Sequence, residues 1–332
     1  MGTTGQDTYP FDGRPVTALC GGIGGAKLAL GLSRVLAPGQ LRVVVNTGDD
    51  FEHLGLHISP DIDTVLYTLS GLADPVRGWG QVDETWAFMA ALEALGGETW
   101  FRLGDRDLAT HVERTRRLRA GESLSSVVEA FAQSLGIATR ILPMSDDSVC
   151  TVVETDEDAL AFQDYFVRRQ CRPRVSAMRY DGADTAGVLP AVLDTIADPE
   201  QAAIILCPSN PYLSIGPILA IPSLRRAILA AAAPVIAVSP IVAGRAIKGP
   251  AAKLMAELGL EVSSAEIARY YRDLIDGFVL DTADADLAAG IGCPTNVTNT
   301  VMESLGDREQ LARTCLSFAA SLSETVGPKR PG

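Results

Sequence analysis

Five short apolar segments constrain the fold of this chain more than any other feature, because each one runs directly into small or polar residues. The segments are residues 16–20, 41–45, 203–207, 234–238 and 277–280. The residues that follow them are, in order, GGIGGAK, NTGDD, PSNP, SPIVAGRAIKGP and Asp281. Continuous apolar runs are typical of parallel strands buried on both faces, and such sheets bind ligands beyond the carboxyl ends of their strands. The pattern therefore predicts five strand ends that meet at one ligand site.

Helical patterns lie between these strands, at residues 27–36 after the first and at residues 251–258 after the fourth. This alternation predicts an α/β protein with a doubly wound, mainly parallel, Rossmann-like sheet. The middle of the chain, about residues 70–200, instead has helical patterns at residues 83–95, 123–136 and 159–169. We expect it to form a largely helical insertion that covers the ligand edge of the sheet. Its part from residue 70 to residue 136 is the candidate for a lid.

Length and charge narrow the class of protein. A chain of 332 residues with a net charge of −13 suits a single α/β domain, predicted at residues 15–325, with flexible tails at residues 1–14 and 326–332. The negative charge argues against a nucleic-acid partner, which needs a basic face. We also expect no membrane partner, because no apolar stretch has spanning length and the start lacks a signal-peptide pattern. The six cysteines are widely spaced, which is typical of reduced thiols in a cytoplasmic protein.

A glycine-rich segment, GGIGGAK at residues 21–27, follows the first predicted strand and opens a helix. Glycines let the backbone approach a phosphate closely, and a helix N-terminus adds N–H donors. The dinucleotide fingerprint requires a glycine where Lys27 stands, and the Walker pattern requires one where Ala26 stands. The segment is therefore either a phosphate loop of another kind or only a tight turn. Its candidate nucleotide-binding residues are Gly22, Gly24, Gly25 and Lys27.

The stretch NTGDDFEHLGLHISPDID, residues 46–63, holds five carboxylates and two histidines directly after the second predicted strand. One interpretation is a solvated acidic loop. The other is a Mg²⁺ site, since Mg²⁺ typically takes one or two carboxylates together with substrate phosphate oxygens. There is no H-E-x-x-H motif, so zinc is disfavoured and we interpret both histidines as structural. Asp49, Asp50, Asp61 and Asp63 lie near the predicted strand end and are the carboxylates that could bind it.

Later segments add groups that suit a nucleotide diphosphate. They lie in SNPYLSIGP and KGP, and the candidate residues are Ser209, Asn210, Ser214, Lys248 and Gly249. The segment LGDRDLATH, residues 103–111, alternates charges around a turn, and its plainest interpretation is a salt-bridge network that fixes a helix start. No nucleophile elbow is present. The polar groups together indicate phosphoryl-type transfer, which depends on positioning and charge neutralisation.

Nine ordered segments resemble one known family, the 2-phospho-L-lactate transferases, over about residues 16–322. They are GGIGGAK, NTGDD, SPDIDTVLY, RGWG, LGDRDLATH, PMSDD, SNPYLSIGPIL, AVSPIVAGRAIKGPAAKLM and EVSS. The resemblance implies a Mg²⁺-dependent homodimer that acts in biosynthesis of the deazaflavin coenzyme F-420. It implies a guanosine diphosphate diester of a phosphorylated three-carbon acid as donor and the deazaflavin Fo as acceptor. The acid moves to the terminal ribityl hydroxyl of Fo and GMP is released. The acid stays open among 2-phospho-L-lactate, phosphoenolpyruvate and phosphoglycerate.

The resemblance also implies roles for individual residues. Asp63 and Arg102 match positions that contact Fo, and the acidic residues of NTGDD and SPDID match the Mg²⁺ region. Of these, Asp49 and Asp63 are the first candidates as metal ligands and Asp61 is the next. The glycine segment, SNP and KGP would hold the guanosine diphosphate. We assign Asp63 and Asp50 as the catalytic groups that orient or deprotonate the attacking hydroxyl. We therefore expect Asp63→Asn to abolish turnover while it leaves the fold intact.

Two other functions compete with this one. The first is a non-enzymatic regulator of the same fold that binds a nucleotide or nucleotide-sugar. It would share the glycine segment and the acidic strand ends, but it would not need RGWG and LGDRDLATH. The second is a nicotinamide-dependent dehydrogenase. The interrupted fingerprint disfavours it, and so does Asn46, which stands where a ribose-binding acidic residue would end the second strand.

Overall fold

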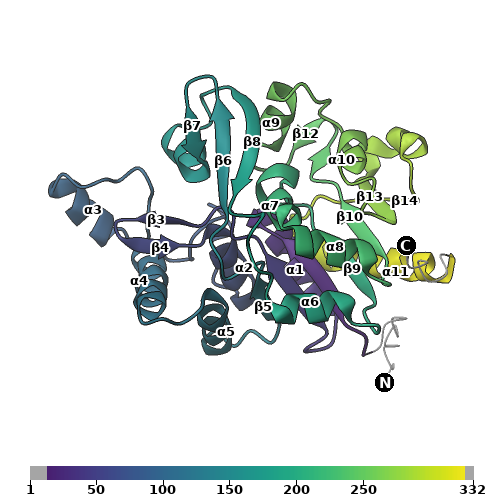
Figure 1. Cartoon of the computed structure of the whole chain (residues 1–332), viewed down its shortest axis with the longest axis horizontal. Helices are drawn as coiled ribbons and strands as arrows, with labels where there is room; N and C mark the ends of the chain where they lie inside the picture. Colours follow the sequence, from purple (N-terminus) through teal and green to yellow (C-terminus); the bar gives the residue numbers. More distant parts are fainter. Residues whose placement is uncertain (1–12, 326–332) are drawn as a thin grey trace.

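The computed structural model describes residues 13–325, and its core is one seven-stranded sheet (Figure 1). Its strands are β1 (Val16–Cys20), β2 (Leu41–Val45), β5 (Arg140–Pro143), β9 (Ala203–Leu206), β10 (Val235–Val238), β13 (Gly277–Asp281) and β14 (Thr295–Thr298). The order is β14-β13-β10-β9-β1-β2-β5, and every pair is parallel. The predicted doubly wound, parallel α/β fold is therefore confirmed, and all five predicted strands lie in this sheet.

Helices cover both faces of the sheet. Successive strand residues point to opposite faces, and the central strands are apolar throughout, so both faces must be covered. In β1, Ala18 belongs to one buried apolar cluster and Leu19 to the other. The first cluster is formed with α1 (Gly22–Val35), α2 (Pro60–Ser70), α5 (Leu124–Ser134) and α11 (Leu305–Thr325). The second is formed with α6 (Pro190–Ala197), α7 (Gly216–Ala220), α8 (Pro222–Ala230), α9 (Ala251–Glu257) and α10 (Ser264–Tyr270). Each fully buried leucine or isoleucine in these layers contributes about 1.5–3 kcal/mol.

The insertion is less helical than predicted. It contains α3 (Ala87–Ala94), α4 (Asp105–Arg119) and α5, but its chain then adds the edge strand β5 to the main sheet. It continues as a separate antiparallel sheet of β6 (Cys150–Thr155), β7 (Ala159–Ala161) and β8 (Val175–Asp181), which rises at the top of Figure 1.

Two of its three predicted helices need correction. The helix predicted at residues 159–169 is wrong in its first part, where the chain forms the strand β7. Leu160 is buried in a small core with Val153 and Val175, while its neighbours Ala159 and Ala161 are exposed, which is the alternation of a strand. Only the short π-helical turn Asp164–Arg168 follows. The helix predicted at residues 83–95 is confined to α3, since Asp83 has a positive φ of 55°. The third is confirmed as α5, with the Ser123 side chain accepting a hydrogen bond from the Ser126 N–H.

Smaller elements complete the fold. The hairpins β3 (Phe51–His53)–β4 (Leu56–Ile58) and β11 (Ile241–Val242)–β12 (Arg245–Ala246) follow strand ends, and a 3₁₀ segment spans Thr282–Gly290. The predicted tails lie outside the described residues, apart from Gly13 and Arg14. Of the six unpaired cysteines only Cys20, Cys207 and Cys315 are buried. Within residues 13–325 no single helix is long and apolar enough to cross a membrane. One pair of helical segments, Pro211–Ala220 and Pro222–Ala230, would together have the length and composition of a spanning segment, but the two are bent by 89°.

Strand order sets the place of the site. From β1 the chain proceeds to β2 on one side, and the later strand β9 pairs with β1 on the other side. The strand order therefore reverses between β1 and β9, and such a switch point opens a crevice at the carboxyl ends of the two strands.

Candidate functional site

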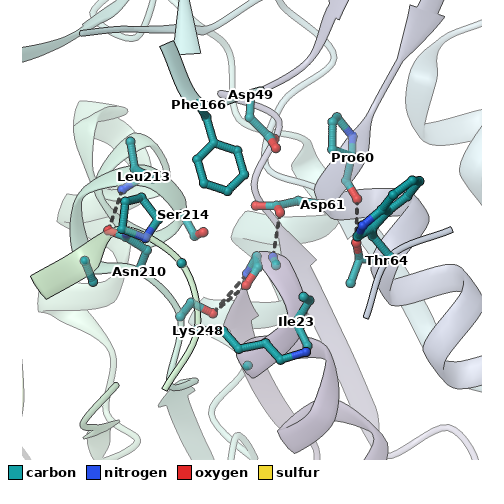
Figure 2. Close-up of a pocket in the computed structure, with 18 of the residues that line it drawn as sticks. Ile23, Asp49, Pro60, Asp61, Thr64, Phe166, Asn210, Leu213, Ser214 and Lys248 are labelled. Carbon is teal, nitrogen blue, oxygen red and sulfur yellow. Dashed lines mark hydrogen bonds between the residues drawn. The ribbon is translucent and has the colours of Figure 1, made fainter. Parts of the chain in front are cut away.

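A cavity of about 560 Å³ lies at this switch point (Figure 2). Four of the five polar segments predicted at strand ends line it, through the glycine segment, Asp49, residues 208–210 and residues 239–240 with 247–251. The fifth, Asp281, lies behind the wall and accepts a hydrogen bond from the Thr300 backbone N–H at 2.7 Å. The insertion supplies much of the rest of the lining, so its prediction as a cover over the ligand edge is confirmed. These lining residues are Trp79, Trp100, Phe101, Arg102, Phe162, Gln163, Phe166, Val167 and Gln170.

The glycine segment is the first part of helix α1 rather than a loop. Gly22 has a φ of +61°, which favours glycine. A Cβ on Gly24 would lie 2.3 Å from the Pro208 carbonyl oxygen, and one on Gly25 would lie 2.4 Å from Ser209 Oγ. These two glycines therefore let α1 pack against the turn after β9, and Gly25 does not line the cavity. The N-terminus of this 14-residue helix still faces the cavity with backbone N–H donors.

Two carboxylates, Asp49 and Asp61, point into one space beside the ring of Phe166 (Figure 2). Asn46 joins them, because its Nδ2 donates to Asp49 Oδ1 at 3.2 Å and to Asp61 Oδ2 at 2.9 Å. The Gly22 N–H donates to Asp61 Oδ1 at 2.6 Å. We name Asp49 and Asp61 the acid pair. Asp49 lies in the turn after β2, and Asp61 lies in the first turn of α2.

Burial makes the acid pair unfavourable without a cation. It raises the pKa of Asp61 to about 6, and hydrogen bonds from Asn46 and Gly22 only partly oppose it. Burial also raises the pKa of Asp49 well above its usual range, and the charges of Asp61 and Asp50 raise it further. A bound cation would relieve this repulsion, and hard carboxylate oxygens are the ligands that Mg²⁺ prefers. The residues therefore fit the predicted Mg²⁺, with Asp49 and Asp61 as the candidate ligands.

Asp63, the third predicted ligand, does not line the cavity. It forms a paired contact with the guanidinium of Arg114, whose second Nη lies 3.1 Å from Asp63 Oδ2, and Arg114 is fully buried. Asp61 and Asp63 are two residues apart in α2, so they point in different directions. Possible metal-binding atoms of Asp63, Asp107 and His111 lie within 4.8 Å of one another, but Arg114 already neutralises Asp63. The geometry thus favours a structural ion pair at Asp63 over the predicted metal, Fo and catalytic roles.

Asp50, the other predicted catalytic group, also lies behind the cavity wall. Its Oδ2 accepts a hydrogen bond from Ser59 Oγ at 2.8 Å and lies 3.2 Å from His57 Nε2. Burial raises its pKa, and the contact with His57 partly opposes this. Its charge therefore acts on the acid pair from behind, while its side chain braces the β3–β4 hairpin.

Cations and amide groups line the side of the cavity near α1. Lys27 Nζ donates to the Met302 carbonyl at 2.6 Å, and burial followed by the charges of Arg308 and Lys248 lowers its pKa. Lys248 lines the mouth together with Gly249. Both lysines therefore present positive charge near the N-terminus of α1, as a diphosphate requires.

The predicted SNP residues have divided roles. Ser209 is structural, since its Oγ accepts from the Gly21 N–H at 3.1 Å and donates to the Gly21 carbonyl at 2.8 Å. Asn210 caps the turn after β9 through its Oδ1, while its buried Nδ2 has no partner within residues 13–325. Ser214 lines the cavity and contributes a hydrogen bond to Asp61. Asn210 and Ser214 are thus the members of this segment available to a ligand.

The insertion lines the cavity with aromatic side chains, and sequence reasoning missed most of them. Phe162 and Phe166 stack with ring centroids 5.3 Å apart and planes at 17°. Trp100 lines the cavity and makes an edge contact with the buried His53 at 5.0 Å. Gln163 Nε2 lies 3.5 Å from Asp49 Oδ2. The spacing of the two phenylalanines four residues apart is the signal that the sequence offers, and such a spacing equally suits one face of a helix.

The segment LGDRDLATH fixes a helix start, as predicted, although backbone hydrogen bonds do this rather than salt bridges alone. The Glu84 carboxylate accepts from the backbone N–H groups of Arg106 at 2.8 Å and Asp107 at 2.9 Å, at the start of α4. In return, Asp105 accepts from the N–H groups of Ala87 and Phe88 at 3.0 Å, at the start of α3. Carboxylates at helix N-termini are typically stabilising by about 0.3–1 kcal/mol each.

Comparison with known proteins agrees with this architecture. The family model described as 2-phospho-L-lactate transferase CofD matches residues 16–291. A phosphoenolpyruvate transferase of Kitasatospora aureofaciens is 45% identical over 92% of this chain and 97% of its own. A 2-phospho-L-lactate transferase of Methanosarcina mazei is 41% identical over 88% of this chain and 96% of its own. A solved structure of a UPF0052 family member from Bacillus halodurans has a TM-score of 0.61 at 14% identity, over 91% and 98% of the chains, and this likeness concerns the fold alone.

Proposed function

This chain belongs to the 2-phospho-L-lactate transferase CofD family, and on that basis we propose that it is a transferase of coenzyme F-420 biosynthesis. It transfers a phosphorylated three-carbon acid from its guanosine diphosphate diester to the ribityl hydroxyl of Fo and releases GMP. One observation carries the proposal: the cavity is lined both by polar groups that include the acid pair, here called the polar wall, and by aromatic side chains of the insertion, here called the aromatic wall. A diphosphate and a flat ring system therefore each find a suitable surface within one cavity.

The donor lies along the polar wall in this proposal. The N-terminus of α1, Lys27 and Lys248 bind the diphosphate oxygens, since backbone N–H groups and ammonium groups are the donors that phosphates accept from. Asn210 offers an unpartnered buried amide to the nucleoside. The relatives named phosphoenolpyruvate transferase support the phosphoenolpyruvate diester as the first donor to assay.

The acceptor lies along the aromatic wall. Its flat deazaflavin ring packs against Phe166 and Trp100, because aromatic faces bind one another in offset or edge arrangements. Arg102 lies on this side, consistent with its predicted contact with Fo. The ribityl chain then extends toward the acid pair, which places its terminal hydroxyl beside the donor phosphorus.

The reaction forms a bond between the ribityl oxygen and the phosphorus of the phosphorylated acid, and it breaks the bond from that phosphorus to the bridging oxygen of GMP. One carboxylate of the acid pair orients the hydroxyl or accepts its proton, which is typically worth about 10²–10⁴-fold. Mg²⁺, held by Asp49 and Asp61, would supply charge neutralisation at the phosphate oxygens. Alignment of the two substrates in one cavity supplies most of the remaining acceleration.

Titration of the protein with Fo tests this proposal, with the deazaflavin fluorescence as readout and with Mg²⁺ and GDP present or absent. We expect saturable binding, followed by turnover when the phosphoenolpyruvate diester is added. Phe166→Ala is expected to weaken Fo binding and to leave GDP binding unchanged. Binding of a nucleotide or nucleotide-sugar without any binding of Fo would overturn the transferase and favour the regulator. The homodimer and the cytoplasmic location stay predictions.

A further inference from the structure

Two guanidinium groups lie close to the ring of Trp86, beside the cavity. The Arg102 guanidinium carbon is 4.3 Å from the ring centroid, and that of Arg77 is 5.2 Å from it. Both distances are within the range of a cation–π contact. Trp79, which lines the cavity, meets the same ring edge-on at 6.1 Å. Trp86 itself does not line the cavity, so any effect on a ligand must pass through its neighbours.

The two arginines differ in the hydrogen bonds and ion pairs that their guanidinium groups form besides the contact with Trp86. Arg77 forms an ion pair with Asp74 at 2.8 Å and donates to the Gln81 carbonyl at 2.9 Å. Arg102 lines the cavity and is exposed, and within residues 13–325 its guanidinium has no hydrogen bond or ion pair. Within the described residues, the contact with the Trp86 ring is therefore the one directional contact of the Arg102 guanidinium. All five N–H donors of Arg102 stay available to a ligand.

The backbone around Trp86 is braced on both sides. Glu84, two residues earlier, binds the start of α4, and Asp105 binds the start of α3 directly after Trp86. A Cβ on Gly104 would lie 2.1 Å from the Glu84 Cδ, so the two segments are packed closely. The ring therefore occupies a position set by two helix starts rather than by a free loop.

We propose that Trp86 is a positioning residue, which holds the Arg102 guanidinium against the cavity so that a hydroxyl or oxyanion of the acceptor meets a cation already in place. The ligand role of Arg102 rests on the proposed function, whereas the restraint on its side chain does not. An arginine stacked on an aromatic face loses less rotamer freedom when a ligand binds. Trp86 thus contributes to acceptor affinity without touching the acceptor.

A double-mutant cycle tests this role by kinetics. Trp86→Leu is expected to raise the KM for Fo by about 2- to 30-fold, the range that corresponds to a cation–π contact, with kcat little changed. Trp86→Phe keeps an aromatic face and should restore most of the affinity. In an Arg102→Met background, Trp86→Leu should cost nothing further, because the group through which it acts is gone. An undiminished cost in that background would refute the proposal, since it would show a general structural role.

A second measurement does not depend on the reaction. An arginine-selective dicarbonyl reagent with peptide mass spectrometry would measure the modification rate of Arg102, with the exposed Arg226 as internal reference. We expect Trp86→Leu to accelerate the modification of Arg102 by about 2- to 30-fold relative to Arg226, and Trp86→Phe to have a smaller effect. An unchanged rate would show that the ring does not restrain the guanidinium. Absence of turnover in the wild-type protein would refute the transferase function and leave this result to decide the positioning role.

Discussion

Replacement of Asp49 by asparagine should make the protein more stable and less active. Asp49 and Asp61 are 5% and 7% exposed, so solvent screens their repulsion weakly. The pKa of Asp61 rises from an ordinary value of 3.8 to about 6. That difference of about 2 units, at about 1.4 kcal/mol per unit, corresponds to about 3 kcal/mol of destabilisation once Asp61 is ionised. Burial is the main cause of that shift, so Asp49→Asn leaves most of it in place. The gain comes from Asp49 itself, whose pKa burial and the charges of Asp61 and Asp50 raise well above its usual range. Removal of this buried carboxylate should recover about 1–3 kcal/mol, which for 332 residues is a rise in Tm of about 1–4 °C.

Asparagine suits this position because its neighbours are amides. Its oxygen can keep the hydrogen bond from Asn46 Nδ2, which is 3.2 Å long in the wild type. Its nitrogen then faces Gln163, whose amide can rotate to present an oxygen. The substitution therefore removes charge without a new unsatisfied polar group. Asp184→Asn, at an exposed carboxylate, is the matched control and should leave Tm unchanged.

Thermal unfolding in EDTA at several pH values is the assay. A carboxyl group with a raised folded-state pKa destabilises the fold increasingly as pH rises above its unfolded value of about 4. Because the pKa of Asp49 is raised, the advantage of Asp49→Asn should grow as pH rises above about 4 and vanish as pH falls toward 4. Mg²⁺ should raise the Tm of the wild type and have little effect on the variant. A lower Tm for Asp49→Asn at pH 7.5 in EDTA would contradict the repulsion between the two carboxylates.

Three further substitutions probe other parts of the site. Gly21→Ala would place a Cβ 2.0 Å from Asp61 Oδ2, so we expect the Tm rise on Mg²⁺ addition to be lost, as thermal unfolding would show. Asp63→Asn leaves the buried Arg114 guanidinium without its ion-pair partner, so we expect the free energy of unfolding in urea to fall by about 3–5 kcal/mol. This revises the expectation that the variant keeps its fold intact. An unfolding midpoint equal to that of the wild type would restore that expectation. Lys248→Met should raise the KM for the diester donor about tenfold, because a charged hydrogen bond to the diphosphate is lost. Binding of Fo, measured by titration, should stay unchanged. Weaker Fo binding would show that Lys248 contacts the acceptor rather than the donor.

The sequence predicted the buried centre of the sheet better than its edges. Strands such as β1 and β9 are covered on both faces, so their continuous apolar runs were visible. The edge strands β5, with the sequence RILP, and β14, with the sequence TNVT, are partly exposed or end in proline and therefore lack such a run. The strand β7 was mistaken for helix because only its pairing with β6 reveals the alternation around Leu160.

The residues of the site also divide into those that the sequence predicted and those that it could not. Polar residues at strand ends were predictable, because parallel strands bring their carboxyl ends to one edge. The choice between Asp61 and Asp63 depended on where α2 begins, which a stretch of sequence with two aspartates cannot settle. The aromatic wall required tertiary contacts, since Trp100 and Phe166 come from separate parts of the insertion.

The hydrogen bond between Gly21 and Ser209 joins residues 188 positions apart, and this separation affects how the protein is made. At a synthesis rate of about 5–20 residues per second, Ser209 follows Gly21 from the ribosome after about 10–40 seconds. During that interval β1 can pair with β2 but has no neighbour on its β9 side. An unpaired strand edge invites pairing with other chains. The half-made protein is thus most exposed to misassembly at the strand that will later carry its reaction centre, and chaperones that bind nascent chains would act on it there.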